Sequence, residues 1–128
     1  MDIKFKEKKV DDKIFSYISN YYQFELPGEH TMYFLIDIER TQSLKYMFKN
    51  YRDLISFSFL DSDEHNVTDL YGMFFHCKSL KSFDFGRNFN AKNVISMGFM
   101  FAYCNSLISV DFSNLYTPNL NIFQQYLP

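Results

Sequence analysis

Two cysteines are the first residues of this 128-residue chain whose type and placement could support chemistry. Cys77 and Cys104 occupy matching positions in two similar segments. If those segments pack side by side, the two backbones lie about 5 Å apart, and a disulfide is geometrically conceivable. Two buried thiols are the better interpretation, because both positions lie among apolar residues and free Cys is among the most buried residue types. His76 beside Cys77 could suggest a metal site or a nucleophile with its base, but Tyr103 stands at the matching place and no acidic partner is evident.

Two aspartates, Asp84 and Asp111, also occupy matching positions and are expected to be neighbours. A carboxylate pair can serve general acid catalysis or bind a cation. No second ligand type accompanies this pair, and the glycines form no phosphate-binding loop. The sequence therefore predicts a solvated acidic stripe, no enzyme, no metal and no cofactor.

The overall composition is that of a globular domain, with 47% apolar and 22% charged residues. The 16 Phe and 10 Tyr, with no Trp, indicate that Phe takes core positions that Leu usually holds. A formal charge of -2 gives no electrostatic reason to expect nucleic acid or anionic lipid as a partner. No apolar run approaches the roughly 20 residues of a membrane span, and the charged start lacks the apolar centre of a signal peptide.

The cysteines and aspartates match because the chain contains an internal repeat. Residues 66–92 (the second copy) align with residues 93–118 (the third copy), and residues 41–65 form a more divergent first copy. A partial fourth copy occupies residues 119–128. The matching apolar positions, which we expect to build the core, are Phe57, Phe59, Met73, Phe74, Cys77, Leu80, Phe83, Phe85, Met100, Phe101, Cys104, Leu107, Val110 and Phe112.

Each copy combines two hydrophobic periods. Val94, Met97 and Met100 recur at three-residue steps, which predicts a short helix with one buried face. Val110 and Phe112 then alternate as in a strand. One such unit cannot bury its own apolar side, so stacked units are needed. We therefore expect an α/β solenoid of helix-turn-strand units with a short parallel sheet in register.

The stretches "NVTDLYGMFFHCKSL" and "NVISMGFMFAYCNSL" closely resemble the BspA-like leucine-rich repeat, the 26-residue repeat of bacterial surface proteins that also occurs in mollicute lipoproteins and protists. The resemblance covers residues 41–123. Tyr51 replaces the repeat's Cys in the first copy, and Phe replaces most strand Leu. The resemblance implies a non-catalytic, adhesion-like module displayed at a cell surface.

The outward residues of the strands form the predicted binding surface, on the concave side of the solenoid. They are Ser56, Ser58, Ser82, Asp84, Ser109 and Asp111. We expect this face to bind a protein or a surface glycan. The alternative is a structural role, in which the uncapped carboxyl-terminal repeat stacks on another copy.

Flanking features complete the prediction. Asn66, Asn93 and Asn119 each precede an apolar stripe and are expected to cap helices. Residues 1–40 lack the repeat and are expected to cap the first unit. Within them, residues 10–22 predict a helix, with a strand as the alternative, and residues 22–38 predict a hairpin that turns at Pro27 and Gly28.

Overall fold

The computed structural model describes residues 5–10, 13–15, 28, 32–36, 41–59, 66–113 and 115–120. These residues contain two small sheets and no helix. The strands are β1 (Phe5–Val10), β2 (Lys13–Phe15), β3 (Met32–Ile36), β4 (Ser56–Ser58) and β5 (Ser82–Asp84).

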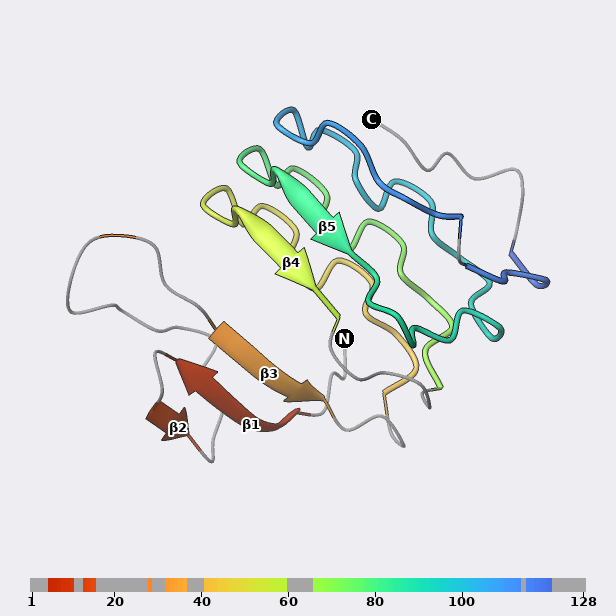
Figure 1. Ribbon diagram of the computed structural model, residues 1–128, viewed down its shortest axis with the longest axis horizontal. Helices are drawn as coiled ribbons and strands as arrows, with labels where there is room; N and C mark the ends of the chain where they lie inside the picture. Colours follow the sequence, from red (N-terminus) through yellow and green to blue (C-terminus); the bar gives the residue numbers. More distant parts are fainter. Residues whose placement is uncertain are drawn as a thin grey trace.

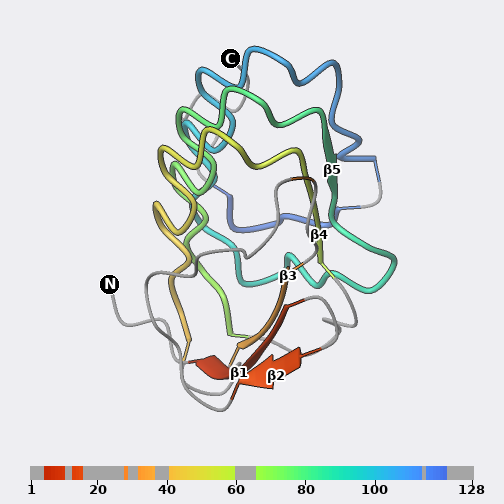
Figure 2. The ribbon, with the colours of Figure 1, turned by 90° about the vertical axis from the view of Figure 1, so that its left-hand side faces the viewer.

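The first sheet is antiparallel, with the strand order β2-β1-β3. Lys8 of β1 is the register partner of Phe15 in β2 and of Phe34 in β3. Residues 13–15 are therefore a strand, and the helix predicted across them is wrong there. β3 overlaps the predicted second strand of the hairpin, residues 33–38, but it pairs with β1. The hairpin's first strand lies outside the described residues. Figures 1 and 2 show this sheet beyond β4, at the opposite end from the third copy.

The second sheet consists of β4 and β5, which run parallel (Figure 1). Their register joins Phe57 to Phe83, and the two rings stack with centroids 6.0 Å apart and planes 6° apart. In the third copy residues 109–111 are not a strand. Phe112 of that copy nevertheless contacts Phe85, with ring centroids 5.7 Å apart.

The segments predicted to be helices are successions of turns (Figure 2). In residues 44–51 the amides of Met47, Lys49 and Tyr51 donate to the carbonyl three residues earlier. The alternate amides donate sideways to the second copy, and the second copy donates to the third in the same way. These lateral donors are Leu44, Tyr46, Phe48 and Asn50 in the first copy and Leu70, Gly72, Phe74 and His76 in the second.

Positive φ angles explain why these segments are not helical. Two matching positions per copy adopt φ between 53° and 65°, a left-handed conformation that a right-handed helix excludes. The residues are Tyr46, Gly72 and Phe99 at one position, and Asn50, His76 and Tyr103 at the other. Three- and four-residue spacing of apolar residues is compatible with either structure, so the hydrophobic pattern could not distinguish turns from a helix. Lateral backbone hydrogen bonds between copies favour the turns.

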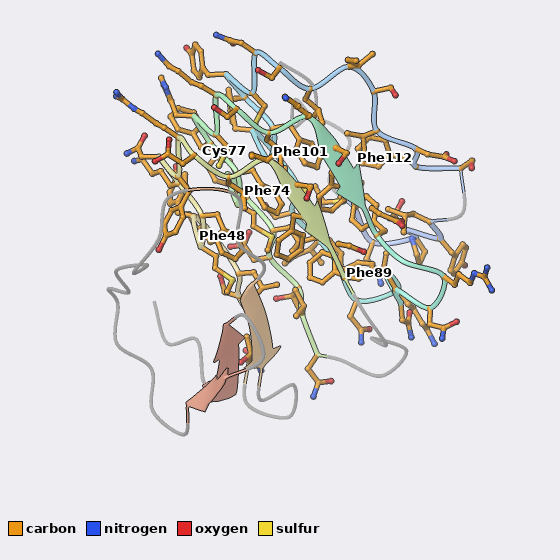
Figure 3. All side chains as sticks on the ribbon, turned by 60° about the vertical axis from the view of Figure 1, so that its left-hand side comes forward. Phe48, Phe74, Cys77, Phe89, Phe101 and Phe112 are labelled. Atoms are coloured by element: carbon orange, nitrogen blue, oxygen red, sulfur yellow. The ribbon has the colours of Figure 1, made fainter. Side chains whose placement is uncertain are left out.

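The core lies between the turn segments and the strands (Figure 3). Phe48, Phe74 and Phe101 stack face to face through the three copies, with centroid distances of 5.5 and 5.7 Å. Burying each such side chain contributes roughly 1.5 to 3 kcal/mol. The fourteen core positions named from the sequence all lie in or against this cluster: Met73, Phe74, Cys77, Leu80, Phe83, Phe85, Met100, Phe101 and Cys104 are buried, and Phe57, Phe59, Leu107, Val110 and Phe112 are partly buried.

Candidate functional site

The cysteines are free, buried and hydrogen-bonded. The Cys77 thiol donates to the Phe48 carbonyl of the preceding copy (3.0 Å), and the Cys104 thiol donates to the Phe74 carbonyl (3.1 Å). Burial raises the pKa of Cys77 to about 12, with a smaller contribution from Cys104, and burial raises the pKa of Cys104 to about 11. Because the thiolate is the reactive form, these two side chains are poorly suited to nucleophilic chemistry and instead join adjacent copies.

His76 does not pair with Cys77 as a base. Its ring stacks on Tyr103 of the next copy, with centroids 4.3 Å apart and planes 24° apart. The structure thus brings His76 and Tyr103 together as aromatic neighbours, while the thiol points to a carbonyl.

The outward strand residues lie where alternation places them. Ser56 and Ser58 of β4, Ser82 and Asp84 of β5, and Ser109 and Asp111 of the third copy are all exposed. The β4–β5 register aligns Ser56 with Ser82 and Ser58 with Asp84. The four residues of the first two copies therefore form adjacent polar rows. All six residues are called the strand face below.

The two aspartates of the strand face have a structural task. The Asp84 carboxylate accepts the amide of Gly86, and the Asp111 carboxylate accepts the amide of Ser113, both at 2.8 Å. Each carboxylate thus holds the turn that follows its strand segment. The hydrogen bonds from Ser113 lower the pKa of Asp111, which is the opposite of what a general acid requires.

Asn66 and Asn93 do not cap helices, because the segments that follow them are turns, and the segment after Leu120 that Asn119 was expected to cap lies outside the described residues. Asn66 and Asn93 precede turns, and both are exposed. Asn119 donates from its side-chain amide to the Lys92 carbonyl at 3.0 Å, which ties the chain after the third copy to the end of the second.

The residues that start the turn segments were missed from the sequence. Ser43 and Asp69 each accept the amide two residues later, at 3.2 and 2.8 Å. Parallel bridges join Ser43 to Asp69 and Asp69 to Ser96. The signal was available, because a small polar residue stands directly before the first apolar residue of each turn segment.

A second surface was also missed. Six rings on the outside of the turn segments form a connected set, called the ring patch below: Tyr46, Tyr71, Phe75, His76, Phe99 and Tyr103. Two lysines of the first copy stand over it. The ammonium group of Lys45 lies 5.0 Å from the Tyr71 ring centroid, and that of Lys49 lies 4.8 Å from the Tyr46 centroid. The sequence signal for the ring patch was the presence of aromatic residues at positions outside the apolar stripe.

Neither surface includes a cluster of metal ligands. Across the residues that the structure describes, no group of three or more His, Cys, Asp or Glu is placed to hold a metal ion. Nor does that part of the chain contain a helix long and apolar enough to cross a membrane.

Comparison with known proteins gives no relative. No family model matches the chain, and neither a curated protein nor a solved structure matches it.

Proposed function

We propose that the chain is a non-catalytic repeat module of the BspA-like leucine-rich-repeat type, which binds a protein or surface glycan through the strand face. The observation that carries the proposal is the register of β4 and β5, which aligns exposed Ser56 with Ser82 and Ser58 with Asp84. Lateral repetition of small polar side chains offers a partner several equivalent hydrogen-bonding positions on a rigid backbone. The resemblance of the repeat to surface-protein repeats points to adhesion.

A solenoid arrangement is part of this proposal. Four lateral amide hydrogen bonds join the first copy to the second, and four at the same positions join the second to the third. Such equivalence of neighbouring interfaces is what a solenoid requires.

The test uses charge to block the strand face without touching its turns. The variant Ser56→Lys/Ser82→Lys/Ser109→Lys leaves both aspartates in place, so the turns after the strand segments keep their hydrogen bonds. A matched control, Asn88→Lys/Ile95→Lys/Asn105→Lys, adds the same charge at other exposed positions. Native chain and variants are screened against an array of glycans and an array of purified proteins. We expect at least one ligand that the control retains and the strand-face variant loses; equal binding by both variants would contradict the proposal.

A second candidate function is structural, and the backbone edge of the third copy favours it. Met97, Phe99, Phe101 and Tyr103 are the counterparts of the lateral donors, yet their amides donate to no residue that the structure describes. An unpaired row of donors is a template for another repeat segment. Sedimentation over a range of concentrations, with hydrogen exchange of these four amides, tests this: growth with new protection supports stacking, and a monomer with fast exchange at all concentrations rejects it.

A further inference from the structure

We propose that the ring patch, with Lys45 and Lys49, is a second docking surface, and that its partner is an acidic protein segment bearing aromatic side chains. The surface lies on the turn segments, whereas the strand face lies on β4, β5 and residues 109–111 (Figure 2). The proposal therefore goes beyond the strand-face function and does not depend on it.

The ring patch is continuous across all three copies. Tyr46 contacts Tyr71 at 5.6 Å between centroids, and Tyr71 contacts Phe99 at 5.7 Å. Tyr46 also contacts Phe75 at 6.3 Å, and Phe75 contacts Tyr103 at 5.4 Å. Two lines of rings thus start at Tyr46 and each crosses from the first copy to the third.

The outer rings of the patch are open to solvent. Tyr46, Phe99 and Tyr103 are 36%, 38% and 54% exposed. Contiguous exposed aromatic area of this kind marks interaction sites, and Tyr and Phe are enriched in the centres of protein interfaces. Tyrosine also supplies a large contact area at a low cost in side-chain entropy.

Backbone conformation adds an independent argument. Tyr46, Phe99 and Tyr103 all have positive φ, where Gly or Asn is favoured. Gly72 and Asn50 occupy matching positions in other copies, so both residue types fit the fold there. Aromatic side chains at three of these strained positions are unfavourable for backbone stability, and strain of this kind is typical of functional surfaces.

The charge on the patch specifies an acidic partner. Lys45 lies over Tyr46 and Tyr71, and Lys49 lies over Tyr46 and Phe75. Neither lysine forms an ion pair with a residue that the structure describes. The Asp69 carboxylate, which lies near Tyr71, accepts the Tyr71 amide at 2.8 Å. The two ammonium groups therefore remain available to carboxylates of a partner, and such complementarity steers association.

The ring geometry favours protein side chains over nucleic-acid bases. Tyr46 meets Tyr71 at 86°, and Phe75 meets Tyr103 at 80°. Perpendicular rings give an uneven surface into which another aromatic side chain fits edge to face. A single-stranded nucleic acid instead needs parallel stacking platforms along an extended cationic track, and two lysines do not provide one.

The test uses a fluorescein-labelled peptide of alternating Glu and Tyr, its analogue of alternating Gln and Tyr, and heparin as an anionic glycan. We expect fluorescence anisotropy to show binding of the Glu-Tyr peptide that weakens with added salt. Affinity should fall about tenfold in Lys45→Gln/Lys49→Gln. The control Arg87→Gln/Lys92→Gln removes the same charge at exposed positions elsewhere and should leave affinity unchanged.

The aromatic contribution is tested with Tyr46→Asn/Tyr103→Asn. Asparagine relieves the backbone strain at positive φ, which offsets the loss of the ring contacts. The urea midpoint should therefore be no lower than that of the native chain, while peptide affinity falls at least as much as in the lysine variant. The proposal fails if the Gln-Tyr peptide binds as well as the Glu-Tyr peptide, or if heparin binds to the patch and the peptide does not. It also fails if the patch variants bind the peptide normally. It fails as well if the native chain binds no peptide but self-associates, and the patch variants no longer self-associate.

Discussion

Replacement of Gly86 with alanine should destabilise the chain severely, because two independent costs coincide there. Gly86 follows β5 with φ of 73°, and its amide donates to the Asp84 carboxylate. A Cβ at this position would overlap the backbone carbonyl oxygen of Phe59. That carbonyl belongs to the end of the neighbouring strand segment, where the Phe59 amide donates to the Asp84 carbonyl at 3.0 Å.

The magnitude follows from adding the two costs. A left-handed conformation costs an alanine about 1–2 kcal/mol. Overpacking against groups that cannot move aside costs about 1–3 kcal/mol more. Backbone is the obstacle here, so relief requires β4 and β5 to separate. We expect a loss of about 2–5 kcal/mol, a large part of the total stability of a small domain.

Urea unfolding followed by far-ultraviolet circular dichroism measures this loss. With a slope of about 2 kcal/mol per molar urea, the middle of the usual range, the midpoint should fall by roughly 1–2.5 M. Gly72→Ala is the matched control, since Gly72 also has positive φ, but its Cβ would meet the Tyr46 ring, which is partly exposed and can turn away. The control should lose only the conformational part, about 1–2 kcal/mol.

Asparagine separates the two costs at Gly86. It accepts positive φ but keeps the Cβ, so Gly86→Asn should remain clearly less stable than the native chain. A Gly86→Asn variant with native stability, or equal losses for Gly86→Ala and Gly72→Ala, would refute the argument from the Phe59 carbonyl.

Three further predictions concern the core, the thiols and one carboxylate. Phe74→Ala should cost about 3–5 kcal/mol in urea unfolding, whereas Tyr116→Ala, at a position 71% exposed, should change stability by no more than about 0.5 kcal/mol; similar losses for both would contradict the stacked core. Cys77 and Cys104 should resist iodoacetamide at pH 8 until the chain unfolds. Since their pKa values are raised from 9.0 to about 12 and about 11, the unfolded state loses their protons first, and stability should fall as pH rises above about 9, less steeply in Cys77→Ala/Cys104→Ala; an identical slope would refute the assignment. Asp111 should titrate below its ordinary pKa in an NMR experiment, and Ser113→Ala should raise that pKa only in part, because the backbone amide still donates; a pKa unchanged by Ser113→Ala would exclude the hydroxyl as a cause.

The inward and outward sides of each copy could be read from the sequence, whereas the backbone path could not. Met73, Phe74 and Cys77 are buried in the structure, and alternation placed Ser82 and Asp84 outside. The burial of the first three residues and the exposure of the last two follow from side-chain polarity and hydrophobic period alone. A turn succession buries the same stripe as a helix, so the choice between them depends on amides such as that of Phe48, which donates to the carbonyl of Met73 in another copy. Such long-range hydrogen bonds leave no mark on hydrophobic spacing.

The two candidate surfaces were likewise predictable from the sequence only in part. The strand-face aspartates were visible as polar residues, but their hydrogen bonds to Gly86 and Ser113 depend on the turns that follow. The ring patch was missed because Tyr46 and Phe99 are apolar residues outside the expected stripe. Only their positive φ angles and lateral neighbours bring them together on one surface.

The sideways amide bonds have a mechanical consequence. They connect the first copy to the second and the second to the third, so a force that draws the two ends of the repeat region apart pulls on these bonds. Copies should peel away singly, and each release frees the residues of one copy, such as the second copy at 66–92. Fully extended, that length of chain spans about 90 Å. Force spectroscopy should record extension steps of this size. The repeat region would then lengthen under load in discrete increments, and each increment would dissipate mechanical energy.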